Sequence, residues 1–308
     1  MKASPPFLAS FFAVCAAALC VSQGKAEPER IPACVEDGAP LQSLAREFKF
    51  TEGPTCDREG NVFFTDQPNN RIMKWSVDGK LSTFLQPSGR ANGMFFATDG
   101  TLIACADEKN ELWAIAPNGT RTVLANAFKG APLNGPNDVW IHPSGAMYFT
   151  DPYYQRSWWT HTNAPQPSQQ VYRLASGAKE PLRIADELMQ PNGIIGTADG
   201  THLFVADIKA GRTYRYEIAV DGSLTNRVLF CERGSDGMTL DIQGNLFLTG
   251  KGVFVFDKSG KQIGHIEVPE RWVANVSFGG KDHRTLFITA TEGLYSLRMK
   301  YPGANPAK

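Results

Sequence analysis

A short β-prone run that ends in an acidic or small residue returns six times along the chain, and this repeat restricts the fold more than any other feature. The runs are NVFFTD from Asn61, then TLIACAD, AMYFTD, THLFVAD, NLFLTG and TLFITA. A turn signal precedes each run, and a second apolar strand follows it. The ends of successive runs are 41, 44, 56, 43 and 40 residues apart. A period near forty with several strands per repeat predicts an all-β protein, a six-bladed β-propeller.

The sixth repeat lacks its last strand, which indicates how the ring closes. Repeats one to five end in a further strand, such as LSTFL or TRTVLA, whereas the sixth ends at GLYSLRMK. An open ring would leave sheet edges exposed. The segment SLAREFKF, residues 43–50, is placed to supply the missing strand. We therefore expect one propeller domain over residues 44–300, closed by an N-terminal strand, between an N-terminal extension (27–43) and a C-terminal tail (301–308).

The first 26 residues have the layout of a secretory signal peptide. Lys2 precedes an apolar run from Phe7 to Val21, and small residues stand at Gly24 and Ala26. The run is short for a helix that spans a membrane. We expect cleavage after Ala26 and an exported protein, periplasmic or secreted, that has no membrane attachment once the signal is removed.

Composition and residue spacing argue against several classes of partner and site. The 31 basic and 31 acidic residues balance, so no nucleic-acid partner is expected. The five His residues are dispersed, and no GxSxG or P-loop motif is present, which disfavours a His-rich zinc site, a serine triad and nucleotide binding. After signal removal four cysteines remain at irregular spacings, and we expect buried thiols with at most one disulfide: Cys34, Cys56, Cys105 and Cys231.

One polar residue opens the first strand of every repeat. The six residues, all Asp, Glu or Asn, are Glu52, Asn92, Asn137, Asn192, Asp236 and Asn275. The first strand of a propeller blade lines the central channel, so six side-chain oxygens should converge there. Turn chemistry could account for the Asn-Gly and Asp-Gly pairs, but not for Glu52. Converging carboxylates and amides are costly unless a cation lies among them, and such oxygens suit Ca²⁺, Mg²⁺ or Mn²⁺.

With these motifs in view, the chain resembles the gluconolactonase / senescence marker protein-30 / luciferin-regenerating enzyme family. The resemblance is carried by EGP at Glu52, NGPNDV and YFTDPYY between Asn134 and Tyr154, PNGI at Asn192 and SDGMTLD at Asp236. It implies a six-bladed propeller with one divalent metal ion in the channel, and hydrolysis of a small-molecule sugar lactone. Ca²⁺ is the expected ion, with Mg²⁺, Mn²⁺ and Zn²⁺ as alternatives.

The resemblance also implies roles for individual residues. The implied metal ligands are Glu52, Asn137, Asn192 and Asp236, and Asp236 also matches the proposed catalytic base. Asn92 and Asn275 are kept as channel-lining candidates for substrate binding. Some family members have an Arg two residues before the second ligand that contacts the sugar. That position is Gly135 here, so the choice of substrate is not implied.

The longest interval contains an aromatic insertion, DPYYQRSWWTHTNAPQPSQQ, between Asp151 and Gln170. Tyr153, Tyr154 and Trp158 are candidates for substrate binding if the insertion acts as a flap over the channel mouth. Alternatively, the insertion is a long loop that anchors its own aromatic side chains on a blade. Both interpretations stay open at this point.

Other functions remain to be weighed against a lactonase. The same metal could polarise a phosphoryl oxygen and support phosphotriesterase activity. A condensation of the strictosidine-synthase type shares the architecture but does not require the four-ligand set. A non-catalytic propeller that binds a ligand through its loops predicts no tightly bound metal, so stabilisation by Ca²⁺ and loss of stability with a chelator would separate it from the enzymes.

Overall fold

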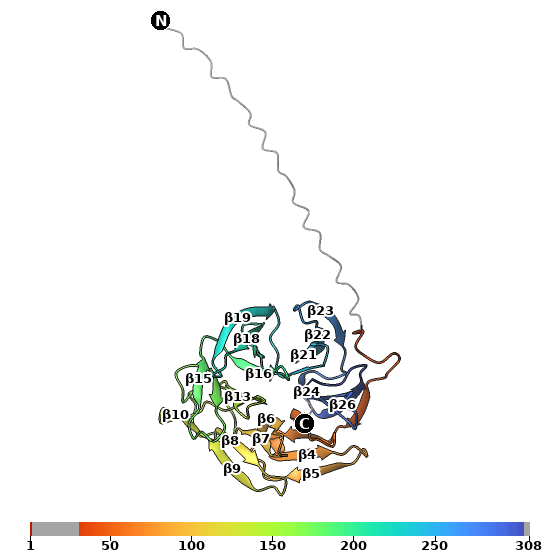
Figure 1. Ribbon diagram of the computed structural model, residues 1–308, viewed down its shortest axis with the longest axis horizontal. Helices are drawn as coiled ribbons and strands as arrows, with labels where there is room; N and C mark the ends of the chain where they lie inside the picture. The colour runs from red at the N-terminus through yellow and green to blue at the C-terminus, as the bar shows by residue number, and fades with distance from the viewer. Residues whose placement is uncertain (2–30, 305–308) are drawn as a thin grey trace.

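The computed structural model describes Met1 and residues 31–304. Beyond Met1, the predicted signal peptide lies outside the described residues, as does the end of the predicted tail. Six four-stranded antiparallel sheets stand in a ring around a central axis (Figure 1). The predicted six-bladed β-propeller is therefore confirmed. In the part of the chain that the structure describes, the single helix is the short η1 (Gln67–Asn69), and no helix has the length and apolar character needed to cross a membrane.

Each blade runs from an inner strand at the axis to an outer strand at the rim (Figure 1). The inner strands are β2 (Thr51–Cys56), β6 (Ala91–Phe96), β12 (Val139–Ile141), β16 (Pro191–Gly196), β20 (Met238–Leu240) and β24 (Val273–Gly279). The second strands, which are the six runs of the repeat, are β3 (Val62–Asp66), β7 (Leu102–Ala106), β13 (Met147–Asp151), β17 (His202–Asp207), β21 (Leu246–Gly250) and β25 (Thr285–Ala290).

The third strands match the second apolar runs of the repeats, and the outer strands complete the sheets. The third strands are β4 (Arg71–Trp75), β8 (Glu111–Ile115), β14 (Gln170–Leu174), β18 (Arg212–Ile218), β22 (Gly252–Phe256) and β26 (Gly293–Arg298). The outer strands are β5 (Leu81–Leu85), β9 (Arg121–Ala125), β15 (Leu182–Ala185), β19 (Leu224–Cys231), β23 (Gln262–Ile266) and β1 (Gln42–Ala45). A small hairpin, β10 (Ala127–Phe128) with β11 (Ala131–Pro132), precedes the third blade.

Burial decreases from the inner part of each blade to its outer strand, because neighbouring blades pack face to face. The second strands β3, β7, β13 and β21 are buried at every residue, so both of their faces are covered. Phe64, Phe149 and Phe247 are fully buried between blades. The outer strands face solvent, and β9 and β19 are mostly exposed. The continuous apolar runs of the sequence are thus strands covered on two sides.

The two ends of the chain close the ring in the sixth blade. β1 pairs antiparallel with β26, and Cys34 O accepts a 2.8 Å hydrogen bond from Lys300 N. The closing strand ends at Ala45, earlier than the predicted residue 50. The reason is that Lys49 N and Phe50 N donate to Asp66 Oδ1 instead, at 3.0 and 3.4 Å, and this turns the chain toward β2. The four cysteines of the described chain are buried thiols, as predicted.

Threonines near the ends of three second strands tie alternate blades to their neighbours. Thr65 Oγ1 donates to Asn92 O at 3.4 Å, Thr150 Oγ1 to Asn192 O at 2.7 Å, and Thr249 Oγ1 to Ala274 O at 2.8 Å. Each acceptor is a carbonyl on the inner strand of the next blade. These bonds hold the inner strands at a common level around the axis, which is the level of the polar residues singled out in the sequence.

Candidate active site

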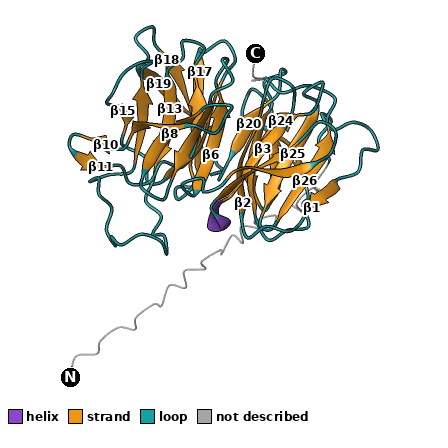
Figure 2. Cartoon of the chain, turned by 90° about the horizontal axis from the view of Figure 1, so that it is seen from below, coloured by secondary structure: helices purple, strands orange, loops and turns teal. Residues whose placement is uncertain are grey.

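The structure places all six polar residues of the predicted ring at the start of an inner strand. Glu52, Asn92, Asn192 and Asn275 lie within β2, β6, β16 and β24, while Asn137 and Asp236 lie two residues ahead of β12 and β20. Asp236 is partly exposed, and the other five are between 2% and 5% exposed. Seen edge-on, this end of the sheets also carries η1, which follows Asp66 (Figure 2). We call this end the insertion face, because the insertion after Asp151 begins there.

The inner strands leave regular pairing where they carry a polar residue. Register shifts occur between Glu52 and Thr55, between Ala91 and Met94, between Pro191 and Ile194, and between Val273 and Asn275. A β-bulge redirects the side chain of the bulged residue. The repeated irregularity therefore explains how one polar side chain per blade is turned out of the sheet.

The glycines that follow the polar residues permit a close approach of the blades. A Cβ on Gly93 would lie 2.3 Å from Asp138 Oδ1, and one on Gly193 would lie 2.8 Å from Asp236 O. On Gly237 it would lie 1.9 Å from the Asn275 side chain. None of these three glycines has a positive φ, so turn geometry is not what selects them. The turn interpretation of the Asn-Gly and Asp-Gly pairs is thus replaced by a steric one.

Buried carboxylates act on one another across this ring. Burial, followed by the charge of Asp236, raises the pKa of Glu52 well above its ordinary value. Burial raises the pKa of Asp236 to about 6, while hydrogen bonds from Trp272 and Asn192 and the charge of Arg156 oppose the rise. Trp272 Nε1 donates to Asp236 Oδ2 at 2.7 Å. Glu52 and Asp236 come from the first and fifth blades, so the predicted convergence on the axis is present.

Asp138 is a third channel carboxylate that the sequence analysis missed. It is 6% exposed and accepts hydrogen bonds from Val139 N at 3.0 Å and Ile194 N at 3.4 Å. Burial raises its pKa to about 7, the charge of Asp236 adds to the rise, and Asn275 lowers it. The available signal was the acid directly after Asn137, where four other blades have glycine. The strict alternation of a regular strand would have sent these neighbours to opposite sides.

The donor set fits a hard divalent cation. Asn92 Oδ1 and Asn192 Oδ1 are buried and accept no hydrogen bond from the described residues. Within residues 31–304, no three His, Cys, Asp or Glu side chains gather closely enough to hold a metal ion by themselves. A cation here would therefore need the amide oxygens of Asn137 and Asn192 beside the carboxylates of Glu52 and Asp236. Amide and carboxylate oxygens with no sulfur or imidazole are typical of Ca²⁺ rather than Zn²⁺ sites.

Buried aspartates at the ends of the second strands fix the backbone that leads to the ring. Asp151 accepts from Asn134 N at 2.9 Å and from Gly135 N at 2.8 Å. Asp207 accepts from Met189 N at 2.8 Å and from Gln190 N at 3.0 Å, and Asp66 holds the equivalent segment of the first blade. The Asp of the repeat is thus a positioning group. It binds backbone N–H groups that lie two or three residues before the polar residue of the ring, and so fixes the position of that residue.

The insertion, residues 152–169, is an anchored loop that also reaches the ring. Gln166 Nε2 donates to Pro132 O at 2.8 Å, and Gln166 N donates to Asn134 Oδ1 at 2.9 Å. The Tyr154 hydroxyl accepts a 2.8 Å bond from Asn192 Nδ2. The interpretation of the insertion as an anchored loop therefore agrees with the structure, and a role for its aromatic residues in substrate binding stays a prediction.

The other two candidates in the insertion lie farther from the ring contacts. The Trp158 ring lies beneath the guanidinium of Arg90, at 4.5 Å, and near that of Arg156, at 5.7 Å. Tyr153 packs against Trp159 with ring centroids 5.8 Å apart, and its hydroxyl bonds to Gln155. Trp158 thus belongs to a cation–aromatic cluster at the channel mouth, whereas Tyr153 supports the insertion from within.

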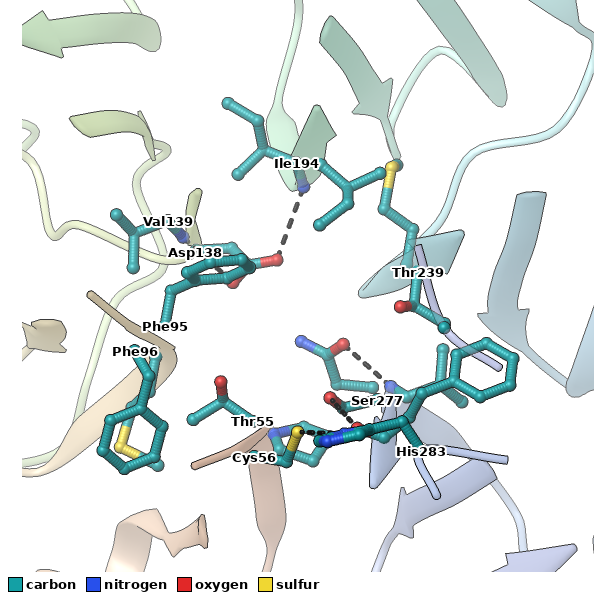
Figure 3. A pocket seen from close by; sticks show the side chains of 18 residues that line it. Thr55, Cys56, Phe95, Phe96, Asp138, Val139, Ile194, Thr239, Ser277 and His283 are labelled. Carbon is teal, nitrogen blue, oxygen red and sulfur yellow. Dashed lines mark hydrogen bonds between the residues drawn. The ribbon is translucent and has the colours of Figure 1, made fainter. Parts of the chain in front are cut away.

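The channel continues on the side of the ring away from the insertion. A cavity of about 40 Å³ lies there, lined among others by Asp138, Thr55 and His283 (Figure 3). Cys56 Sγ lies 3.5 Å from His283 Nδ1. The C-terminal segment crosses this end, because Gly303 N donates to His283 O at 3.0 Å and Ala304 N donates to Leu240 O at 2.8 Å. Gly303 itself lines the cavity.

Comparisons with known proteins agree with this geometry. The family model described as SMP-30/Gluconolactonase/LRE-like region matches residues 50–292. The chain belongs to this family. It is 30% identical over 302 residues to a gluconolactonase of Zymomonas mobilis, with 88% of this chain and 84% of the relative covered.

Solved structures of relatives superpose on the same ring. A gluconolactonase of Xanthomonas campestris is 27% identical, with a TM-score of 0.81 and coverage of 88% of this chain and 94% of the other. A regucalcin of Agrobacterium tumefaciens, described as a calcium-binding protein, is 20% identical with a TM-score of 0.72 over 87% and 98% of the two chains. At that identity the regucalcin supports the fold alone.

In this SMP-30/gluconolactonase chain, Gly135 has a steric role that the sequence did not reveal. A Cβ there would lie 2.8 Å from the Trp159 ring and 2.9 Å from Asp107 Oδ1. The space that a side chain would need is taken by the insertion and by the second blade. An Arg at this position, as expected in some members, is therefore excluded from this chain, and any cation at the mouth has to come from elsewhere.

Proposed function

We propose that this protein is a metal-dependent hydrolase that opens sugar lactones. Lactone hydrolysis is supported by the family and by the gluconolactonases of Zymomonas mobilis and Xanthomonas campestris. The observation that carries the metal requirement is the set of carboxylates at Glu52 and Asp138, which are buried, and Asp236, which is partly buried, beside an Asn192 oxygen that accepts no hydrogen bond from the described residues. Such a group of acceptors is costly to bury without a cation.

Glu52, Asn137, Asn192 and Asp236 are the residues that would hold the ion, and Ca²⁺ is the ion we propose. A bound divalent cation supplies Lewis-acid polarisation of the lactone carbonyl, worth several kcal/mol to the transition state. Asn192 is oriented for this task by its contact with Tyr154, which engages the amide nitrogen and leaves Oδ1 for the channel. Glu52 is held by its own neighbour, since Gly53 N donates to Oε2 at 2.7 Å.

Asp236 acts as the general base in this proposal. Trp272 engages its Oδ2, which fixes the carboxylate and leaves Oδ1 to accept a proton. A water held by Asp236 attacks the carbonyl carbon while its proton passes to Oδ1. The ring C–O bond then breaks, and the same proton moves from Asp236 to the leaving oxygen. The product is the open-chain hydroxy acid, and Asp236 returns to its starting state.

The decisive experiment is a metal-controlled assay on a substrate panel. The protein is stripped with EDTA and assayed on D-glucono-1,5-lactone, other sugar lactones and the phosphotriester paraoxon, before and after Ca²⁺ is restored. We expect lactone hydrolysis that EDTA abolishes and Ca²⁺ restores. Turnover of paraoxon alone would favour the phosphotriesterase alternative, and no turnover of any substrate would favour a binding propeller. No observation in the structure favours either alternative over the lactonase.

We also propose that the protein is exported to the periplasm or the medium. This rests on the composition of residues 1–26. Expression of the full chain followed by cell fractionation and N-terminal sequencing tests it. We expect a product that begins at Glu27, outside the cytoplasm.

A further inference from the structure

One aspartate of the repeat is used differently from the others. Asp66, Asp151 and Asp207 accept backbone N–H groups of the segment that leads to the ring. Asp107, at the equivalent place in the second blade, instead accepts from Arg156 Nε at 2.7 Å and from Gln67 Nε2 at 3.1 Å. Its side chain is 2% exposed. Within the described residues, Asp107 therefore binds side chains, a cation among them, and no backbone N–H of the segment that leads to the ring, whereas Asp66 binds both that backbone and Arg71.

The insertion delivers that cation in a fixed position. Trp159 Nε1 donates to Asp107 O at 2.7 Å, and Trp159 N donates to Arg156 O at 3.2 Å. The Trp159 ring occupies the space left by the missing side chain of Gly135. The backbone and the side chain of Arg156 are thus both held against the second blade. Because the side chain is already ordered, it would lose less conformational entropy when it binds a ligand.

The guanidinium of Arg156 faces the ring of polar residues through Tyr154. It lies 5.5 Å from the centre of the Tyr154 ring, and the hydroxyl of that ring accepts the 2.8 Å bond from Asn192. The side chain is 20% exposed. Its Nε binds Asp107, whereas its two Nη groups form no hydrogen bond with the described residues. Up to four N–H donors are thus available beside the candidate metal site.

We propose that Arg156 is a specificity-determining residue that binds the hydroxyl oxygens of a polyhydroxylated sugar lactone, an inference that rests on the lactonase function proposed above. An arginine offers hydrogen-bond donors and no acceptor. It therefore raises the affinity for a substrate that carries hydroxyl oxygens and does not raise the affinity for an unsubstituted alkyl ring. Arg90, whose guanidinium lies 4.5 Å from the centre of the Trp158 ring, adds a second cation to the same cluster. The cluster thus supplies the positive charge that a side chain at position 135 could have supplied.

The test compares two lactones in two matched variants. Arg156→Gln removes the proposed contact. Arg71→Gln is the control, because Arg71 pairs with the equivalent aspartate, Asp66, at 2.9 Å and is exposed to a similar extent, 23% against 20%. D-Glucono-1,5-lactone carries hydroxyls, and δ-valerolactone has the same ring without them. We expect Arg156→Gln to raise KM for gluconolactone about tenfold or more, with kcat within about threefold. Its kcat/KM for δ-valerolactone should stay within about twofold, and Arg71→Gln should behave as the parent.

The outcomes separate this inference from the proposed function. An equal loss on both lactones would mean that Arg156 acts through Asp236 or the fold, and unchanged kinetics on gluconolactone would mean that it does not touch substrate; either overturns the inference. If the parent hydrolyses neither lactone, the lactonase proposal fails. Calorimetric binding of the non-hydrolysable D-gluconolactam then decides about Arg156. Weaker binding by Arg156→Gln supports its role, and equal or absent binding in parent and variant overturns it.

Discussion

The side-chain amide of Asn192, on the inner strand of the fourth blade, donates a 2.8 Å hydrogen bond to the hydroxyl of Tyr154, on the insertion of the third. This contact fixes which atom of the amide faces the channel. With Nδ2 engaged, Oδ1 is left for a cation, and it accepts no hydrogen bond from the described residues. The insertion therefore contributes to the candidate metal site without supplying a ligand.

Tyr154→Phe should weaken Ca²⁺ binding, because the amide of Asn192 loses the acceptor that holds its orientation. We expect the apparent Kd for Ca²⁺ to rise about tenfold, which is the order of effect known for partners that orient metal ligands. Calorimetric titration measures it. Tyr153→Phe is the matched control, since the hydrogen bond of that hydroxyl among residues 31–304 goes to Gln155 of the same insertion. Equal affinities in both variants would show that Tyr154 does not orient Asn192.

Ca²⁺ should stabilise the folded protein. A ligand that binds the native state alone contributes about 2.7 kcal/mol at a concentration one hundred times its Kd. For a chain of this size we expect the melting temperature to rise by about 5 °C or more over the EDTA-treated protein. Differential scanning fluorimetry with Ca²⁺, Mg²⁺ and EDTA measures this and ranks the ions. If no divalent ion changes the melting temperature, the proposed metal site is wrong.

Glu52→Gln and Asp236→Asn should each lower kcat/KM for gluconolactone by at least about a hundredfold, since each removes a proposed charged ligand and Asp236→Asn also removes the proposed base. Both substitutions preserve side-chain size and relieve the repulsion between the carboxylates of Glu52 and Asp236. The EDTA-treated variants should therefore melt at or above the temperature of the EDTA-treated parent. Loss of activity together with a lower melting temperature would instead indicate damage to the fold.

The metal-free protein should lose stability as the pH rises from about 4 to about 7. Burial raises the pKa of Asp236 to about 6 and that of Asp138 to about 7, from 3.8. In this window the folded state holds protons that the unfolded chain has released, so the free energy of unfolding falls with increasing pH. Melting curves in EDTA between pH 4.5 and 7.5 measure it, and Asp138→Asn should show a shallower fall. Because Ca²⁺ binds the ionised carboxylates, its stabilising effect should grow over the same range.

Thr249→Val should destabilise the ring between the fifth and sixth blades. Thr249 Oγ1 donates to Ala274 O at 2.8 Å and accepts from Gly237 N at 2.8 Å, and the residue is 2% exposed. Removal of the hydroxyl leaves two buried backbone groups without a partner, which costs about 1–3 kcal/mol. Urea unfolding measures the loss. Thr225→Val on the exposed outer strand β19 should change stability by less than about 0.5 kcal/mol. A similar effect at both sites would contradict a specific role for the tie between blades.

Much of the fold could be predicted from the sequence because every blade repeats the same physical solution. The second strands are apolar on both faces and stand out as continuous runs, so their number and spacing identify the ring. The length of the closing strand could not be predicted. It depends on the hydrogen bonds that Lys49 N and Phe50 N donate to Asp66 Oδ1, and no local sequence pattern predicts this contact between two segments.

The candidate site could be predicted only in part, for related reasons. One polar residue per repeat is a periodic signal, and it located the six residues of the ring, whereas the choice of Glu52, Asn137, Asn192 and Asp236 among them as metal ligands rests on the family resemblance. Asp138 escaped because an irregular strand start lets two neighbouring side chains face the channel. Arg156 escaped because it lies in an insertion that occurs in one blade only, so no repeat reveals where the insertion returns to the ring.

Closure in the sixth blade has a consequence for how the protein is made. β1 is synthesised first and its partner β26 last, and the ring joins Glu52 of the first blade to Asn275 of the sixth. The ribosome must therefore release almost the whole polypeptide before the pocket can exist. A polypeptide that ends before β26 would lack both the β1–β26 pairing and the pocket. Only a fully translated chain can therefore be active.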